Sequence, residues 1–314
     1  MSKKQQIIDL WKTSFNDSDT FIQFYFNKVY KDENALTITK NGKIISALQL
    51  IPYDMTYGKE TISVGYISGA CTDPSERGKG WMHQLLLQAF EMMKERNMTI
   101  TVLIPAEKSL FYYYQTQGYT PVYDYSLRLF SIKEPGSINN HIQIKPLNEE
   151  LFHSSYIYFD RKLRERPMSI LHSEDDFKNI VTDNRLDGGD VAVATNEKND
   201  VTGIAFISFA EDKKIIIKEI LYNREEIKNA LLTAIANHYK TPQLIYKTPP
   251  SLPDTHPYGM AMVIDRQKMI TLWKATNPEN PHSFDLLNTM NIQELTALTL
   301  GYNERKAYMN LMMD

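Results

Sequence analysis

The sequence predicts an α/β protein with a mixed central sheet, arranged as two domains of which the second repeats the first. Three observations support this prediction. A strand pattern, a short glycine-containing loop and an amphipathic helix follow one another over residues 62–93. The same order of strand, turn and helix returns over residues 214–239 without the glycines. The length of 314 residues is about what two domains need.

The composition is that of a globular protein that can bury a sizeable core, with 42% hydrophobic and 23% charged residues. A net charge of −3 gives no electrostatic reason to expect a nucleic acid or an anionic membrane as partner. The single cysteine, Cys71, cannot form an internal disulfide, and without a signal-peptide pattern this indicates a cytoplasmic protein. No segment approaches 18 apolar residues, so no membrane span is expected. The seven histidines are scattered, and no metal site is predicted.

The first 60 residues predict two helices followed by antiparallel strands. Apolar stripes at helical spacing lie within residues 5–30, and Ser18 or Asp17 suits a cap between the two helices. The aromatic residues of these helices either line an acceptor pocket or pack in the core. Residues 35–50 form a hairpin around Asn41-Gly42, and the meander continues over residues 52–60.

The loop between strand and helix is suited to an anion. Gly78 and Gly80 flank Lys79, so the backbone can bend sharply and approach a ligand closely. Free amide groups at the start of the following helix favour a phosphate or pyrophosphate. The Walker pattern is absent, and the dinucleotide fingerprint fails because His83 stands where its last glycine is required.

A third type of phosphate loop fits better. The coenzyme A pattern [RQ]-x-x-G-x-[GA] is met at five of six positions by Arg77-Gly78-Lys79-Gly80-Trp81-Met82, with Met82 as the departure. The segment resembles the core motif of the GCN5-related N-acetyltransferases. The resemblance implies that this loop and the first helical turn hold the pyrophosphate of acetyl-CoA, while the preceding strand pairs with its pantetheine arm. The implied strand contacts are Ala70, Cys71 and Thr72, and the implied pyrophosphate cradle is Arg77, Gly78, Lys79, Gly80, Trp81, Met82 and His83.

A second motif follows at the distance that this family uses. A short apolar strand over residues 99–104 ends at Pro105, and a helix then ends in Tyr113-Tyr114 before Gly118-Tyr119. The resemblance implies that Tyr114 protonates the departing thiolate of CoA. Taken alone, the pattern around Tyr114 favours a core aromatic residue, and it is the loop upstream that favours the catalytic interpretation. Where the family often carries an asparagine contact to CoA, this chain has Glu107, which leaves Ser109 as a substitute.

The second half repeats the first without its chemistry. We expect a catalytic domain over residues 1–130, a linker over residues 131–140, a degenerate domain over residues 141–255 and a short C-terminal segment over residues 256–314. The second loop has no glycine and carries two acidic residues where phosphate would bind. The repeat should therefore fold in the same way and should not bind CoA.

An active acetyltransferase domain followed by a degenerate one resembles the multi-domain acetyltransferases of the enhanced intracellular survival (Eis) type. These proteins end in a sterol-carrier-like domain, of which the short tail here would be a remnant. The resemblance implies that the C-terminal carboxylate, on Asp314, acts as the catalytic base.

The expected function is acetyl transfer from acetyl-CoA to a primary amine by direct attack. Strand amides near Cys71 would polarise the thioester carbonyl and Tyr114 would serve the leaving thiolate. The base that deprotonates the amine is either a water chain or the C-terminus. The sequence does not identify the acceptor, and a homo-oligomer is possible. Cys71 as a nucleophile competes with the simpler interpretation of a small buried residue. The alternative functions are a non-catalytic acyl-CoA sensor and, less well supported, a dinucleotide-dependent oxidoreductase.

Overall fold

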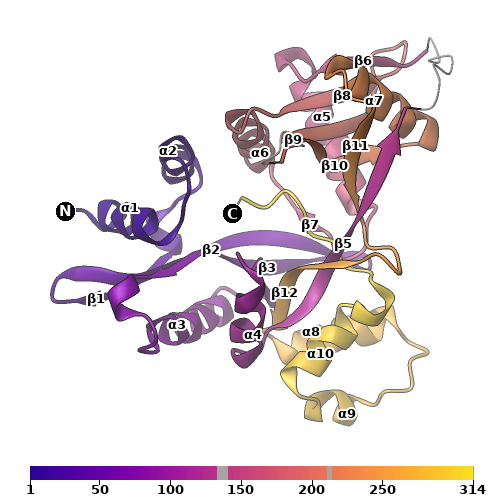
Figure 1. Ribbon diagram of the computed structural model, residues 1–314. Helices are drawn as coiled ribbons and strands as arrows, with labels where there is room; N and C mark the ends of the chain where they lie inside the picture. Colours follow the sequence, from indigo (N-terminus) through magenta and orange to yellow (C-terminus); the bar gives the residue numbers. More distant parts are fainter. Residues whose placement is uncertain (133–140, 211–213, 314) are drawn as a thin grey trace. The chain divides into compact units, whose positions relative to one another are not determined.

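A computed structural model describes residues 1–132, 141–210 and 214–313 (Figure 1). The contacts divide these residues into two compact units. The first contains residues 1–123 and 257–307, and the second contains residues 124–256 and 308–313. Most of the expected linker, and Asp314, lie outside the described residues. The chain therefore returns to the first unit after the second, and the domain boundaries expected from sequence stay a prediction.

Two helices open the first unit, α1 (Lys3–Ser14) and α2 (Asp19–Lys28). Each begins at a serine, Ser2 or Ser18, whose hydroxyl accepts a hydrogen bond from a backbone amide three residues later. The helices pack through an aromatic cluster in which the Trp11 ring lies 4.8 Å from Tyr25 and 5.4 Å from Phe26. The aromatic stripes of this region are thus largely core.

The sheet of the first unit has the order β1-β2-β3-β4-β12. All neighbouring pairs are antiparallel except β3 with β4. The turn between β1 and β2 is formed by Asn41 and Gly42, both with positive φ, as the sequence predicted. The strands are β1 (Ala35–Lys40), β2 (Lys43–Tyr57), β3 (Glu60–Thr72), β4 (Ile100–Leu103) and β12 (His256–Val263).

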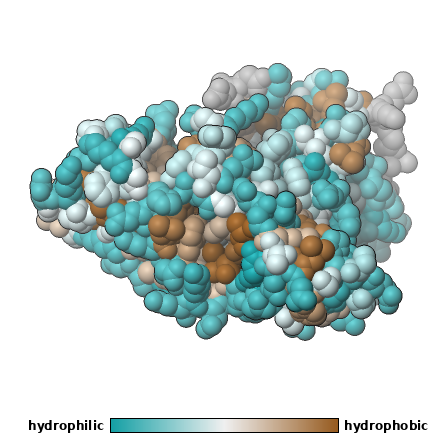
Figure 2. All heavy atoms as spheres, turned by 90° about the horizontal axis from the view of Figure 1, so that it is seen from below, coloured by the Kyte–Doolittle hydropathy of each residue, from teal (hydrophilic) through white to brown (hydrophobic). Residues whose placement is uncertain are grey.

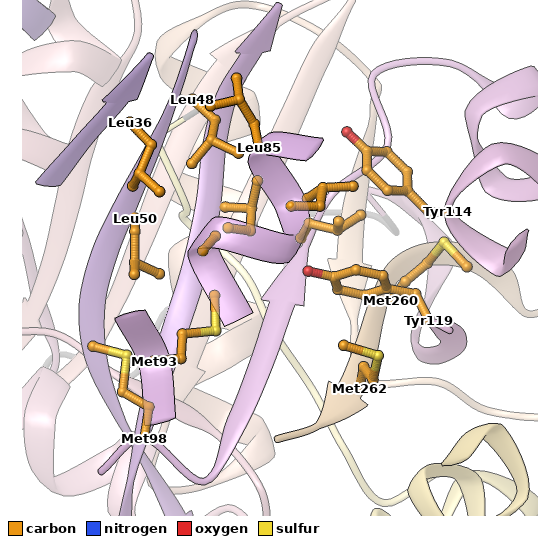
Figure 3. Packing of buried hydrophobic residues seen from close by; sticks show 14 residues of the cluster. Leu36, Leu48, Leu50, Leu85, Met93, Met98, Tyr114, Tyr119, Met260 and Met262 are labelled. Carbon is orange, nitrogen blue, oxygen red and sulfur yellow. The ribbon is translucent and has the colours of Figure 1, made fainter. Parts of the chain in front are cut away.

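The helices α3 (Trp81–Glu95) and α4 (Lys108–Thr116) pack on this sheet. The α3 face with the predicted 3.6-residue spacing buries Leu85, Leu86 and Met93 in the core shown in Figure 3. Burial of each such side chain stabilises the fold by about 1.5 to 3 kcal/mol. Helix α3 is therefore held by its core face, and its N-terminal end is left at the edge of the sheet.

Three further helices belong to the first unit, α8 (Arg266–Thr276), α9 (Phe284–Thr289) and α10 (Ile292–Thr299). The side-chain amide of Gln293 on α10 donates hydrogen bonds to the carbonyl oxygens of Gln115 and Tyr119, at 3.0 and 2.8 Å. The hydroxyl of Tyr57 on β2 donates to the carbonyl of Thr299. The C-terminal segment thus supports the end of α4.

The second unit repeats the sheet of the first in the order β5-β11-β10-β9-β8-β6. Again one central pair, β10 with β11, is parallel, and the helix α7 (Glu225–His238) connects its strands. The helices α5 (Glu149–Arg164) and α6 (Glu174–Leu186) also belong to this unit. The strands are β5 (Thr120–Ser131), β6 (Gln143–Pro146), β8 (Asp190–Thr195), β9 (Val201–Phe209), β10 (Ile215–Tyr222) and β11 (Gln243–Thr248); the short β7 (Ile170–Leu171) is not part of this strand order.

The predicted fold class, α/β with a mixed sheet, is confirmed. On the face drawn in Figure 2, hydrophilic residues predominate and hydrophobic side chains form smaller patches between them. Among the described residues, no helix has the length and apolar character needed to cross a membrane.

Candidate active site

The site begins where two parallel strands of the first unit separate. Pairing of β3 with β4 runs from Val64 opposite Ile100 to Ile67 opposite Leu103 and then ends. Strand β3 continues to Thr72 with β2 alone as its partner. The backbone of the last residues of β3 is therefore open on one side, which is the edge that an extended ligand could pair with.

A bulge reshapes β3 just after the separation. Cys71 lies opposite Ala47 and Ser68 lies opposite Gln49, so two residues of β3 face one residue of β2. One of the two is Gly69, with φ of 57°. A Cβ at this position would come within 2.2 Å of the Trp11 ring, so only glycine fits. The bulge turns the following strand residues toward the opening.

The opening is a cleft of about 870 Å³. Its walls come from the end of α1, the end of β3, the loop after β3, and α4. The lining residues are Ser14, Phe15, Asn16, Ala70, Cys71, Thr72, Glu76, Arg77, Gly78, Gly80, Trp81, Met82, His83, Ala106, Glu107, Leu110, Tyr113 and Tyr114.

Helix α3 directs its N-terminus at this cleft. Gly80 is its N-cap with φ of 83°, and Gly78 has φ of 76°. The first backbone bond of the helix runs from the Gln84 amide to the Gly80 carbonyl, so the amides of residues 81–83 have no partner within the helix. These amides and the helix dipole favour an anion at this end of the cleft.

Charged side chains brace the loop before α3. The carboxylate of Glu76 accepts hydrogen bonds from Lys40, Lys79 and the Trp81 indole at 2.9, 3.0 and 3.2 Å. The side-chain hydrogen bond from Lys40, followed by that from Lys79, lowers the pKa of Glu76 to about 2. The negative charge of Glu76 is therefore compensated by Lys79 within the loop and by Lys40 on β1.

A second carboxylate fixes the start of the same loop. Asp73 accepts from Lys43 at 2.8 Å and from the backbone amide and hydroxyl of Ser75. The hydrogen bond from Lys43 is the main cause that lowers the pKa of Asp73 to about 2. The Arg77 guanidinium turns back and donates to the Thr72 carbonyl at 3.1 Å. The loop is thus fastened to the β1–β2 hairpin on one side and to the end of β3 on the other.

Tyr114 stands on the opposite wall of the cleft. Its ring is 7% exposed and makes edge contacts with Tyr113 and Tyr119, at centroid distances of 5.2 and 5.7 Å. Figure 3 shows Tyr114 and Tyr119 next to each other at the border of the core cluster. Burial raises the pKa of Tyr114 well above its ordinary value, so its hydroxyl stays protonated at neutral pH. Among the residues that the structure describes, none is hydrogen-bonded to this hydroxyl.

The end of α4 holds Tyr114 in place. Gly118, with φ of 96°, follows the C-cap, and its amide donates to the Gln115 carbonyl while the Tyr119 amide donates to the Tyr114 carbonyl. This is a Schellman motif, as the glycine in the sequence predicted. The Tyr119 hydroxyl is hydrogen-bonded to Thr101 on β4 at 3.0 Å. The turn therefore ties α4 to the sheet.

Cys71 lies in the cleft wall but does not suit a nucleophile. It is 5% exposed, and burial raises the pKa of its thiol to about 12. The reactive thiolate is therefore rare at neutral pH. The interpretation as a small buried strand residue fits this environment.

The structure brings most of the predicted site residues together. Ten of the thirteen line the cleft, namely Ala70, Cys71, Thr72, Arg77, Gly78, Gly80, Trp81, Met82, His83 and Tyr114. Lys79 is in the loop but bonds to Glu76 and to the Ser75 carbonyl. The Ser109 hydroxyl donates a hydrogen bond to the Glu107 carboxylate and does not line the cleft, whereas Glu107 does. Asp314 lies outside the described residues.

Sequence reasoning missed the contribution of the loop after α1. Ser14, Phe15 and Asn16 line the cleft, although only their place between two helices was visible in the sequence. It also missed the role of Glu76, whose partner Lys40 is 36 residues away. No cluster of three or more metal-ligating side chains occurs among the described residues.

Comparison with known proteins agrees with this geometry. Residues 1–122 match the family model described as acetyltransferase (GNAT) domain. No curated protein is similar enough in sequence to count as a match.

Solved structures share the fold over most of the chain. A GCN5-related N-acetyltransferase from Anabaena variabilis ATCC 29413 superposes with a TM-score of 0.70 at 16% identity, over 85% of this chain and 72% of that one. A probable N-acyltransferase from Enterococcus faecalis V583 gives 0.67 at 12% identity, over 83% and 70%. Eis1 from Mycobacterium abscessus gives 0.66 at 8% identity, over 86% and 73%. With its N-terminal cleft and matching family model, the chain is an acyltransferase that carries a domain of the GCN5-related N-acetyltransferase (GNAT) family.

Proposed function

We propose that the chain transfers the acetyl group of acetyl-CoA to a primary amine. The observation that carries the proposal is that one cleft has an anion-binding helix N-terminus at one end and a protonated tyrosine in its wall. The pyrophosphate would bind at the amides of residues 78–83, and the pantetheine arm would pair with the open edge of β3 at residues 70–72. The thioester would then lie near Tyr114.

The proposed reaction balances with the two substrates alone as reactants. The amine nitrogen attacks the thioester carbonyl carbon, and amides at the β3 bulge near Cys71 stabilise the oxygen that becomes negative. The carbon–sulfur bond then breaks, and the sulfur takes the electron pair. Tyr114 offers its phenol hydrogen to that sulfur, first as a hydrogen bond and then as a proton. The attacking amine loses its proton to water or to a base, for which the C-terminal carboxylate of Asp314 remains a candidate.

The test compares CoA release by wild type and by Tyr114→Phe with a panel of amines that contains aminoglycosides, polyamines, amino acids and lysine peptides. We expect kcat to fall by about tenfold to a hundredfold, with little change in KM for acetyl-CoA. Tyr112→Phe is the matched control, because Tyr112 is on the same helix and 75% exposed. Equal turnover in the Tyr114 and Tyr112 variants would remove Tyr114 as the acid.

A second measurement separates catalysis from sensing. Titration calorimetry with acetyl-CoA should show binding in wild type, and the Tyr114 variant should bind equally well. Tight binding without turnover of any amine would favour the acyl-CoA sensor that the sequence left as an alternative. Absence of binding would refute the placement of the cofactor in this cleft.

A further inference from the structure

The second unit contains its own version of the strand separation. Pairing of β10 with β11 joins Ile216 to Ile245 and Ile217 to Tyr246 and then ends, while β10 continues to Tyr222. A register shift against β9 places a bulge on β10 just after Ile217. The second unit has therefore kept both features that open the cleft in the first unit.

In the second unit a segment of the same chain lies at this separation. The side chain of Asn310 donates hydrogen bonds to the Lys218 carbonyl on β10 and to Glu219, the latter at 3.2 Å. Its amide oxygen lies 3.5 Å from the Lys247 ammonium on β11. Lys218 and Lys247 are the first residues beyond the last paired ones on their strands. One carboxamide thus connects the two strands at the point where they part.

The rest of the segment 308–313 is equally engaged. Tyr308 forms a parallel bridge with Ser169, and its ring lies 4.9 Å from the Arg166 guanidinium. The imidazole side chain of His172 is hydrogen-bonded to the backbone of Asn310. In Figure 1 the yellow C-terminal trace accordingly runs past β7. The other members of the segment are buried, namely Met309, Leu311, Met312 and Met313.

A buried carboxylate makes this contact specific. Glu219 is 1% exposed and accepts two hydrogen bonds from Arg166, both at 3.1 Å, and one from the Ile220 amide. Asn310 supplies a further donor. A buried charge is costly unless hydrogen bonds surround it, so loss of the segment would leave Glu219 less well satisfied.

We propose that segment 308–313 is an intramolecular ligand of the second unit, and that the β10–β11 separation is a peptide-binding site. A carboxamide can give the strand carbonyl the hydrogen bond that an amide of a pantetheine arm would give. The start of α7 carries Glu225 and Glu226, which repel a pyrophosphate. Because the segment is tethered, its effective concentration at the site is high. The proposal does not depend on the function proposed for the first unit.

The first test supplies the segment in trans. A chain that ends at Ala307 should unfold several degrees below the full chain. A synthetic peptide of residues 308–313 should raise its melting temperature in a saturable manner. The same peptide with Asn310→Ala should be at least about tenfold weaker, since it lacks the bridging amide. Equal effects of the two peptides, or an unchanged melting temperature of the shortened chain, would overturn the proposal.

The second test keeps the chain complete, because the shortened chain could fail to fold. In Asn310→Ala, hydrogen exchange at β10 and β11 should be about tenfold faster than in wild type. Asn303→Ala is the control, because Asn303 is an exposed residue of the C-terminal region. Equal exchange in both variants would refute the bridging role of Asn310. A dimer of the full chain that dissociates on mutation of Asn310 would instead assign the segment to a second copy and overturn the intramolecular ligand.

Discussion

The ammonium group of Lys40 lies 2.9 Å from the carboxylate of Glu76, which connects the edge strand β1 to the loop before α3. The same carboxylate holds Lys79 and Trp81. The loop before α3 is thus organised by a negatively charged residue, although the helix N-terminus that follows favours an anion. The Glu76 carboxylate would have two opposite effects on binding of the proposed cofactor. It braces the loop, and it repels the negatively charged phosphates.

We expect bracing to outweigh repulsion. Glu76→Ala should weaken CoA binding by up to about fivefold and leave kcat unchanged, because surface ion pairs contribute modestly. The control is Glu91→Ala, since Glu91 pairs with Lys94 further along α3. Calorimetry with CoA measures the effect. Tighter binding by Glu76→Ala would mean that repulsion dominates.

The same pair predicts how CoA affinity depends on pH. The pKa of Glu76 is lowered to about 2, so its contribution is present above its ordinary pKa and is lost only as the pH falls toward about 2. Affinity should therefore not change between about pH 5 and 8 through this group. A titration of affinity across that interval, in wild type and in Glu76→Gln, checks the sign. A loss of affinity near pH 5 in wild type alone would contradict it.

Gly80 is expected to serve both the backbone and the ligand. Gly80→Ala should cost about 1 to 2 kcal/mol of the free energy of unfolding, because φ is 83°. It should also weaken CoA binding, since the first helical turn would shift. Gly188→Ala is a matched control with φ of 80° and equally open space, but outside the cleft. Urea unfolding and calorimetry should show equal destabilisation and unequal binding; equal binding would separate Gly80 from the ligand site.

The hydroxyls of Thr101 and Tyr119 hold the end of α4, and removal of one should destabilise the fold more than removal of the other. Thr101→Val leaves the buried Tyr119 hydroxyl without its partner, whereas Tyr119→Phe leaves Thr101 bonded to the Gly65 carbonyl. We expect Thr101→Val to cost about 1 to 3 kcal/mol and Tyr119→Phe less. Urea unfolding of both variants and of the double variant measures the coupling. The reverse order would show that the two hydroxyls are not coupled in this way.

Buried tyrosines predict loss of stability in alkali. Burial raises the pKa of Tyr119 and Tyr123 above their ordinary value near 10. The raised pKa means that the stabilisation is complete below about pH 10 and decreases as the pH rises above it. Tyr123→Phe should therefore flatten the fall in the free energy of unfolding by about 1.4 kcal/mol per pH unit. Tyr112→Phe, which alters an exposed residue, should leave the curve unchanged; parallel curves for both variants would contradict the prediction.

Removal of one partner of the ion pair between Arg166 and Glu219 should lower the free energy of unfolding strongly. Replacement of both partners should lower it much less. Arg166→Met leaves a buried carboxylate without its main partner and should cost about 3 kcal/mol or more. The double variant with Glu219→Met should recover much of that loss. Arg164→Met is the control, because Arg164 is half exposed and pairs with Asp160 on the same helix. Urea unfolding that shows no recovery in the double variant would contradict this account.

Local patterns predicted much of the fold. The helix over residues 81–95 followed from the spacing of its apolar side chains, the turn at Asn41-Gly42 from its residue types, and the end of α4 from Gly118. The helices α6 and α8 were missed. Both have more polar than apolar residues on average, and tertiary packing of one face decides whether such helices form.

The sequence by itself determined the glycine-containing loop, the helix that follows it and the tyrosine motif, because each is a short stretch whose residues interact with near neighbours. Only the tertiary structure decided what completes the cleft and what fills its counterpart. Phe15 reaches the cleft, Lys40 reaches Glu76, and Asn310 reaches Lys218 across 92 residues. These contacts depend on how strands separate and how the chain returns to them, and no local pattern in the sequence encodes that path.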